Sequence, residues 1–255
     1  ADGGSVLRGR CYEFQGALPY QAVNEALAGY VERIPSMESL ELPNSVLAEL
    51  ARLVPAIRRR CPGIEPTRPA SGGGGRERFF DSVAALLRAV PRPVLFLDDL
   101  HWADEGTLDL LHYLVRAFDD GPCWFVGACR PEETPLDHPL TRLGQGLSRD
   151  GLAHRLDLSP LAESDISQVT SERLAEAEAE ALAAYLFRQS GGNPFIVTEV
   201  LEMLVEEGLL EVGLGRWHLL DALDGQEMLP ARVQDVILQR VGRLSEEGRW
   251  ALHVA

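Results

Sequence analysis

The sequence contains no lysine. All 24 of its basic residues are arginines, and they stand against 39 acidic residues, which gives a formal net charge of -15. A chain this acidic repels phosphate backbones and anionic lipids, so direct binding to nucleic acid or to a membrane surface is not expected without a local basic patch. The densest basic group, Arg58–Arg60 with Arg52, falls where the pattern predicts a helix end, and cations are favoured there for structural reasons.

Cysteines and long apolar runs are also scarce. The four cysteines, at positions 11, 61, 123 and 129, show no metal-binding spacing, which favours reduced thiols over a disulfide framework. No apolar run reaches the roughly 18 residues of a membrane helix, and the first residues lack the pattern of a signal peptide. We therefore expect a cytoplasmic protein with no membrane partner.

The composition is otherwise that of an ordinary globular protein. Of the 255 residues, 45% are apolar and 25% are charged. This balance excludes disordered and collagen-like chains, and the length predicts one or two domains with a sizeable core.

The first half has the pattern of an α/β domain. Apolar residues recur every three or four positions over 17–34, 44–57 and 76–90, which predicts helices, and a short strand is expected around Val6. Residues 62–75 contain three prolines and four consecutive glycines, a composition typical of a flexible connection.

Two continuously apolar segments, Val94–Leu97 and Trp124–Ala128, predict buried strands of a parallel sheet. A helix over about 107–118 separates them, so the three elements form a right-handed βαβ unit. A further strand is predicted at His154–Leu158. Beyond it the pattern predicts helices over 163–174, 175–189 and 194–207, a hairpin around 213–215, and more helix from 230 onward.

Two carboxylates, Asp98 and Asp99, directly follow the first of these strands. In an open parallel sheet, ligands bind at the carboxyl ends of the strands, so acids here are expected to face a crevice rather than the core. Because side chains alternate along an extended strand, the two should point different ways and are not expected to share a proton. One suits a hydrated Mg²⁺ and the other an attacking water.

Two other interpretations of this segment remain open. The acids can instead cap the next helix, and Asp104 or Thr107 has the right position for such a cap. Asp98, Asp99, His101 and Asp104 also have the ligand types of a zinc or iron site, although no pair shows the helical i, i+4 spacing. Without a metal, His101 would pack the turn into the following helix.

Arg130 directly follows the second apolar strand. An arginine at one strand end, beside aspartates at the neighbouring strand end, is suited to reading a terminal phosphate and spreading its charge. The alternative is an ion pair with Asp98 or Glu132.

The segment Ser190–Phe195 lies between two predicted helices. Its glycines end one helix and Pro194 begins the next, so it can be a plain helix-turn-helix corner. It becomes a nucleotide contact only if it lies on a lid opposite the strand ends.

Together these segments resemble the ATPase module of the STAND class of P-loop NTPases, as found in large LuxR-type regulators and related signalling proteins. The resemblance covers nearly the whole chain, and its most specific block is Phe96–Asp104. Each of its other segments is weak evidence alone, and their order along the chain supports the resemblance. They are Leu7–Glu13, Pro19–Tyr20, Thr107–Leu111, Cys129–Glu133, Gly191–Phe195 and Leu229–Leu244.

The resemblance implies a role for several residues. The strand that ends in Asp98 would be the Walker B strand, with Asp98 in the magnesium shell and Asp99 activating water. Arg130 would be the sensor near the γ-phosphate. Asn193 and Pro194 would form the lid motif beside the adenine.

The resemblance also implies a fold. Residues 1–160 would form a partial P-loop NTPase core, an α/β domain with a parallel sheet and helices on both faces. Residues 161–208 would form a helical lid, and 209–255 a hairpin with the start of a winged-helix region.

The phosphate loop that defines this class is not found in the sequence. That loop, G-x-x-x-x-G-K-[ST], needs a lysine, and neither Gly3–Gly4 nor Gly72–Gly75 is followed by the required residues. Because Ser5–Gly9 matches the second strand of the family sheet, we expect the first strand and its loop upstream of Ala1. The family sheet order of five, one, four, three, two then predicts a gap between the strands near Phe125 and Leu156.

The sequence thus predicts a switch module that binds ATP and Mg²⁺ in a signalling or transcription-regulatory protein, with hydrolysis in the longer parent chain and self-association through the same module. A second hypothesis is a nucleotide-responsive scaffold that does not hydrolyse. Direct DNA binding by this segment fits the acidic charge badly.

Overall fold

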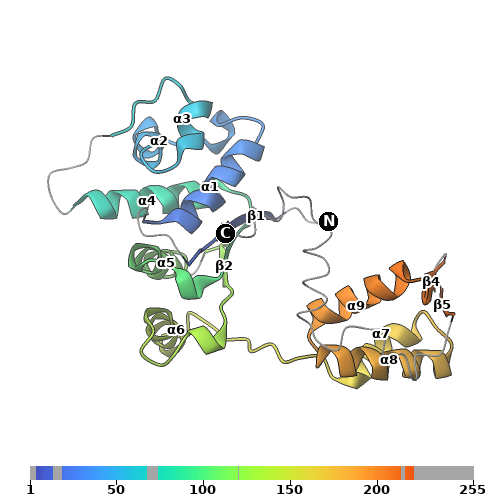
Figure 1. Cartoon of the computed structure of the whole chain (residues 1–255). Coiled ribbons are helices and arrows are strands. Elements are labelled where there is room, and N and C mark those ends of the chain that lie inside the picture. The colour runs from blue at the N-terminus through green and yellow to red at the C-terminus, as the bar shows by residue number, and fades with distance from the viewer. Residues whose placement is uncertain (1–3, 14–18, 68–73, 120, 214–215, 221–255) are drawn as a thin grey trace. The chain divides into compact units, whose positions relative to one another are not determined.

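The computed structural model of the chain describes residues 4–13, 19–67, 74–119, 121–213 and 216–220. The chain divides into two compact units, an N-terminal unit of Ala1–Leu156 and a C-terminal unit of Asp157–Ala255. Figure 1 shows the elements of each.

The N-terminal unit has the order expected of an α/β domain. Its elements are β1 (Ser5–Arg10), α1 (Gln21–Arg33), η1 (Glu38–Leu40), α2 (Asn44–Leu50), α3 (Pro55–Arg60), α4 (Gly74–Ala89), β2 (Pro93–Asp98), η2 (Leu100–Trp102), α5 (Glu105–Ala117), β3 (Trp124–Gly127), η3 (Pro131–Glu133) and α6 (Pro139–Arg149), where η marks a 3-10 helix.

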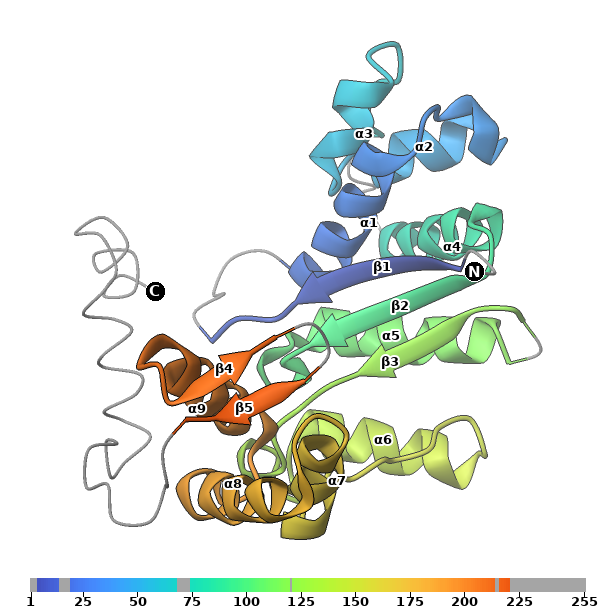
Figure 2. The ribbon, with the colours of Figure 1, turned by 90° about the vertical axis from the view of Figure 1, so that its right-hand side faces the viewer.

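The three strands form a parallel sheet in the order β1-β2-β3. Val6 pairs with Val94 and Val94 with Trp124, so the three strands run in step and their carboxyl ends meet at one edge (Figure 2). The predicted α/β class with a parallel sheet flanked by helices is confirmed.

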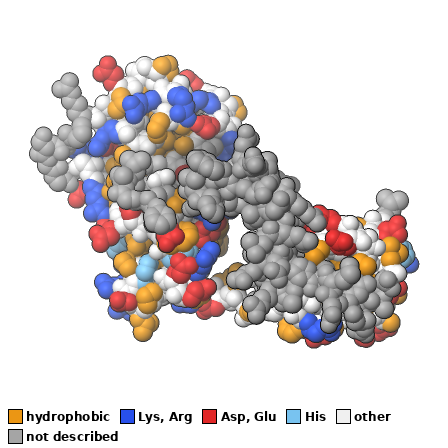
Figure 3. Space-filling view, in the orientation of Figure 1, with side chains coloured by type: hydrophobic (Ala, Val, Ile, Leu, Met, Phe, Trp, Pro, Cys, Tyr) orange, Lys and Arg blue, Asp and Glu red, His pale blue; other side chains and the backbone are white. Residues whose placement is uncertain are grey.

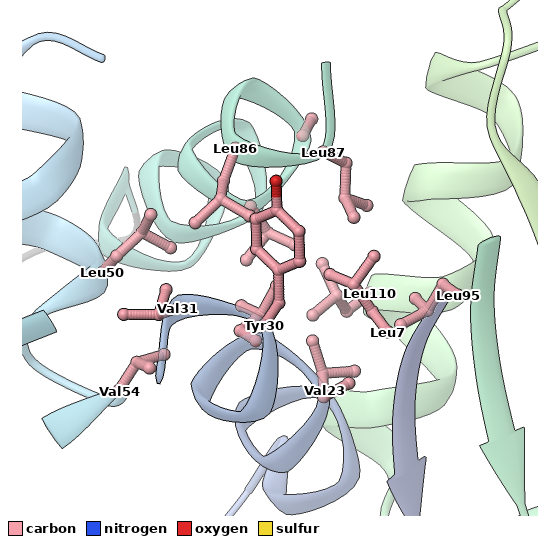
Figure 4. Packing of buried hydrophobic residues seen from close by; sticks show 14 of the residues in the cluster. Leu7, Val23, Tyr30, Val31, Leu50, Val54, Leu86, Leu87, Leu95 and Leu110 are labelled. Carbon is pink, nitrogen blue, oxygen red and sulfur yellow. The ribbon is translucent and has the colours of Figure 1, made fainter. Parts of the chain in front are cut away.

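The core of this unit lies between the sheet and helices α1 to α5. Figure 4 shows Tyr30 of α1 among Leu50, Leu86 and Leu87 of the surrounding helices, with Leu7 of β1 at the sheet side of the same cluster. Each fully buried leucine contributes about 1.5–3 kcal/mol to stability. The core therefore holds the strands, and with them the strand ends, in a fixed register.

The two faces of the sheet are buried unequally. Leu95 and Leu97 of β2 are fully buried against the helices. On the other face, Val6 is 52%, Trp124 73% and Val126 43% exposed. These three residues lie in two neighbouring rows of the paired strands, so they form one apolar surface.

Two sequence predictions differ from the structure in this unit. The helix predicted over 44–57 is two helices, α2 and α3, because Pro55 cannot continue a helix and instead begins a new one. The strand predicted at His154–Leu158 is not formed, and Leu156 and Leu158 are exposed. An apolar alternation becomes a strand only where a neighbouring strand can pair with it, and the described sheet contains only β1, β2 and β3.

The C-terminal unit is mainly helical. Its described elements are α7 (Glu163–Ser171), α8 (Glu176–Ser190), α9 (Pro194–Glu206), β4 (Leu210–Val212) and β5 (Trp217–Leu219). Its core is a separate cluster that includes Ile166, Leu182, Leu186 and Leu204. Strands β4 and β5 pair antiparallel, as the predicted hairpin requires. The winged-helix segment predicted from Pro230 onward lies outside the described residues.

The helices of the described ranges are all too short or too polar to cross a bilayer. The four cysteines are free thiols in the structure.

Candidate functional site

The carboxyl ends of the three strands bring polar side chains to one edge of the sheet. Arg10, the last residue of β1, pairs in register with Asp98, the last residue of β2. Backbone hydrogen bonds continue the sheet past this point, from the Cys11 N–H to the Asp98 carbonyl at 3.0 Å and from the Leu100 N–H to the Ala128 carbonyl at 2.8 Å. The segment after β3 is thereby held beside the two aspartates.

The chain turns sharply between the two aspartates. Asp99 has a left-handed backbone (φ 51°, ψ 41°), and its N–H donates to Asp98 Oδ1 at 3.1 Å. Aspartate and asparagine adopt this conformation more readily than most residues. The extended backbone of β2, which was expected to point the two carboxylates to opposite faces, therefore ends at Asp98.

Both carboxylates are paired with arginines of β1. Arg10 donates from Nε to Asp99 Oδ2 at 2.8 Å, and Arg8 lies 3.4 Å from Asp98 Oδ2. The Asp99 side chain is 12% exposed and that of Asp98 27%. Hydrogen bonding to Asp99 raises the pKa of Arg10. The more accessible acid is thus the one with the longer ion pair.

The Cys11 thiol, which follows β1, lies near several of these acids. Burial, reinforced by Asp104, Asp99, Glu25 and Asp98, raises the pKa of its thiol to about 12. Burial is the larger cause, and the acids add to it, so the Cys11 thiol stays protonated beside the strand ends.

His101 links the two sides of the site. Its side chain is fully buried, and Nδ1 accepts a hydrogen bond from the backbone N–H of Arg130 at 3.4 Å. Nε2 lies 3.3 Å from Glu133 Oε2 and 3.9 Å from Asp99 Oδ1, yet completes no hydrogen bond. This imidazole therefore touches both the turn after β2 and the turn after β3.

Arg130 begins the turn after β3. Its guanidinium forms an ion pair with Glu133 at 3.1 Å and lies over the ring of Trp102, 5.8 Å from its centroid. In the part of the chain that the structure describes, no ion pair joins it to Asp98 or Glu132, the two partners predicted as alternatives. Glu133 is three residues after Arg130, and the 3-10 turn η3 between them brings their side chains together.

Asp104 is the N-terminal cap of α5, one of the roles that the sequence left open for it. Its side chain caps α5 by accepting from the Thr107 N–H at 2.9 Å, and it also accepts from the Tyr20 N–H at 3.2 Å. Among the described residues, no three histidines, cysteines or acids are arranged to hold a metal ion. The zinc or iron site considered for Asp98, Asp99, His101 and Asp104 is therefore not formed.

Asn193 and Pro194 lie in the C-terminal unit, at the corner between α8 and α9. Asn193 caps α9 by accepting from the Phe195 N–H at 3.0 Å, and Pro194 is the first helical residue. Gly191 and Gly192 before them have positive φ. The corner is thus explained by helix capping alone, while Asn193, Pro194 and Phe195 remain exposed.

The basic group at 52–60 is structural, as predicted. Arg60 donates to the carbonyls of Ile34 and Pro35 at 2.9 and 3.0 Å, and Arg59 and Arg52 form ion pairs with Glu32 and Glu49. Figure 3 shows the basic side chains gathered around α2 and α3, interleaved with acidic ones.

A known protein family matches a segment of the chain that includes the ends of β1 and β2. Residues 1–126 match the family model of the AAA ATPase domain. The matched segment contains β1, β2 and both aspartates, and it ends before Arg130. The match supports an ATPase module in general terms, with a nucleotide as its class of ligand.

Solved structures give a weaker similarity. A point variant of RuvB from Thermotoga maritima is 20% identical over 66% of this chain and 51% of the RuvB chain, with a TM-score of 0.34. The T. maritima structure described as RuvB, Holliday junction branch migration motor, is 17% identical over 86% of this chain and 75% of that one, with a TM-score of 0.29. The first alignment spans about half the RuvB chain, and TM-scores this low do not establish a shared fold. No curated protein sequence matches the chain.

Three contacts of this candidate site were not found from the sequence. They are Arg10 with Asp99, Glu133 with Arg130, and His101 with both turns. Arg10 lies in a segment that the family resemblance includes, but the sequence did not indicate Asp99 as its partner. The signal for Glu133 was the i, i+3 spacing from Arg130 within a turn that begins with Pro131.

Proposed function

We propose that this chain supplies the magnesium and water end of an ATP site in a signalling or transcription-regulatory ATPase. The observation that carries the proposal is the placement of Asp98 and Asp99 at the carboxyl edge of the parallel sheet, within the segment that matches the AAA ATPase domain. Ligands bind at this edge in open parallel sheets.

The residues at this edge fit Mg²⁺ bound with a nucleotide. Magnesium prefers oxygen ligands and takes one or two carboxylates, several waters and the substrate phosphates. Asp98 offers such a carboxylate, half-buried and only weakly paired with Arg8. A bound Mg²⁺ would neutralise charge on the phosphates.

Asp99 is the proposed water-activating acid. Its buried carboxylate is held in place by Arg10, so an attacking water can be oriented without reorganisation of the acid. The proposed sensor, Arg130, is 55% exposed and is held by a surface ion pair. Such pairs are weak, so Arg130 can exchange Glu133 for a phosphate oxygen at little cost.

Asn193 and Pro194 are the proposed contact on the adenine side. They are exposed at the start of α9. We further propose self-association through the same module.

The test uses the protein at its full natural length, which is called the extended protein below. Asp99→Asn keeps the left-handed backbone and the side-chain shape, so the fold should persist. If Asp99 acts as a general base, the rate of ATP hydrolysis falls by about two to four orders of magnitude. Asp109→Asn, which changes an exposed acid of α5 paired with Arg76, is the matched control and should hydrolyse normally.

A non-hydrolysing scaffold is the second candidate function. The 2.8 Å contact between Arg10 and Asp99 favours it, because Arg10 already occupies a carboxylate oxygen that an attacking water would need. In that case the extended protein binds ATP with equal affinity in the wild type and in Asp99→Asn, and neither releases phosphate. Undiminished hydrolysis in Asp99→Asn would exclude the proposed role of Asp99.

A further inference from the structure

The imidazole of His101 is the least explained polar group of the N-terminal unit. It is fully buried, and its Nε2 is one of the few buried side-chain atoms among the described residues without a hydrogen-bond partner. Buried polar groups are nearly always satisfied, so an exception in a native structure calls for a reason. The atoms around it supply one.

The contact at Nδ1 determines where the imidazole carries its proton. The Arg130 N–H donates to Nδ1, so Nδ1 must be the unprotonated nitrogen. In the neutral ring the hydrogen then lies on Nε2, which makes Nε2 a donor. Its two nearest acceptors are the carboxylates of Glu133 and Asp99.

The charges around the ring are already balanced in pairs. Asp99 has Arg10, and Glu133 has Arg130, so neither carboxylate depends on a charged imidazole. The ring therefore acts by geometry: it is a rigid spacer on the turn after β2, and its two nitrogens face Arg130 and Glu133 of the turn after β3. Trp102, whose ring centroid is 4.5 Å from that of His101, and the Leu100 N–H bond to Ala128 hold the spacer in place.

We propose that His101 is a positioning residue that ties the turn of Arg130 to its own turn beside Asp99, through the hydrogen bond that Nδ1 accepts from the Arg130 backbone. Its Nε2 faces the carboxylate of Glu133 at 3.3 Å and that of Asp99 at 3.9 Å. The inference rests on the proposed function, because it assigns the coupling between the water-activating acid and the phosphate sensor. When Arg130 leaves Glu133 for a phosphate, Glu133 becomes free to complete the missing hydrogen bond from Nε2.

The first arm of the test needs no nucleotide. Nitrogen NMR of the extended protein labelled with ¹⁵N-histidine reports which ring nitrogen is protonated, and the signal of His101 is the one that disappears in His101→Asn. We expect a neutral ring protonated at Nε2. A ring protonated at Nδ1 would overturn the proposal, because Nδ1 could not then accept from Arg130. This arm gives a result even if the protein does not hydrolyse ATP.

The second arm separates positioning from mere packing. Loss of a residue that orients a functional group typically costs about 10- to 100-fold in activity, so His101→Ala should lower kcat by that factor while ATP affinity changes little. His101→Asn retains an acceptor near the position of Nδ1 and should recover most of the rate, whereas His101→Gln, which reaches only the Nε2 position, should not. His112→Asn on α5, an exposed histidine, is the control and should be unaffected.

Stability measurements complete this arm. If His101 only fills space, kcat of the folded variants is unchanged and the three variants differ in unfolding temperature alone, which would overturn the proposal. Equal kcat in His101→Asn and His101→Gln, both reduced, would also overturn it, because the assigned hydrogen bond at Nδ1 would then have no effect. Absence of hydrolysis in the wild type would refute the proposed function instead.

Discussion

At the scale of single residues, the Asp99 carboxylate is placed by one contact that is distant in the sequence and by the turn to which it belongs. Arg10 reaches it from β1, His101 approaches it from η2, and its own left-handed backbone turns it out of the strand. The position of the two acids at a strand end could be predicted from the sequence, because an apolar run followed by aspartates is a local pattern. The Arg10 contact could not, because it depends on the register between β1 and β2.

The same limit applies to Arg130. The sequence indicated an arginine beside carboxylates but suggested Asp98 or Glu132 as its partner. Turn η3 begins with Pro131 and brings Glu133 under the guanidinium instead. A one-residue difference in a short turn changes the partner of a side chain, and such turns are the part of a fold that sequence patterns specify least.

The cysteines give a residue-scale prediction. Burial and nearby acids raise the pKa of Cys11 to about 12, and burial raises that of Cys123 to about 11. The thiolate is the reactive form, so in the folded protein at pH 8 neither should react appreciably with iodoacetamide, whereas the exposed Cys129 should. Mass spectrometry after brief labelling measures this, and in denaturant all four should react alike. Rapid labelling of Cys11 in the folded protein would contradict the described packing.

At the scale of elements, the patterns that were predicted correctly are those with clear periodicity. Helix α1 buries Val23, Leu27, Tyr30 and other residues on one stripe, and β2 is a continuous apolar run. Helix α6 was not predicted, because Leu147 is its only buried residue and two glycines interrupt its stripe. Its remaining signal, a proline at the first helical position, is shared with many turns.

The contact between β1 and α1 gives an element-scale prediction. A Cβ on Gly9 would lie 1.8 Å from the carbonyl oxygen of Ala22, so the backbone of one element must move to accommodate it. Gly9→Ala should lower the free energy of unfolding by about 1–3 kcal/mol, measured by urea denaturation. The strand end that carries Arg10 should be displaced with it.

Gly29 provides the matched control within α1. A Cβ there meets no atom within 4 Å. Gly29→Ala should therefore stabilise the protein by about 0.5–1 kcal/mol, the ordinary gain of alanine over glycine inside a helix. If Gly9→Ala were as stable as Gly29→Ala, the close approach of β1 and α1 would be wrong.

At the scale of the whole molecule, the sheet presents an exposed apolar face and an edge strand. Val6, Trp124 and Val126 lie on that face, and β3 has β2 as its one neighbour within the described sheet. Parallel sheets are ordinarily covered on both faces, and exposed edges pair readily with further strands. A strand that paired with β3 would lie next to the carboxyl edge that carries the aspartates.

The measurement that tests the account most directly locates the metal of a bound nucleotide. Mn²⁺ takes the same oxygen ligands as Mg²⁺ and broadens the NMR signals of nearby nuclei. With ATP and Mn²⁺ bound to the ¹⁵N-labelled extended protein, and Mg²⁺ as the diamagnetic reference, we predict that broadening centres on the amides of residues 98–101 and 128–130. It should leave those of α2 and α3 sharp. Broadening centred elsewhere, or no difference between Mn²⁺ and Mg²⁺ in the presence of bound ATP, would contradict the placement of the ATP site at these strand ends.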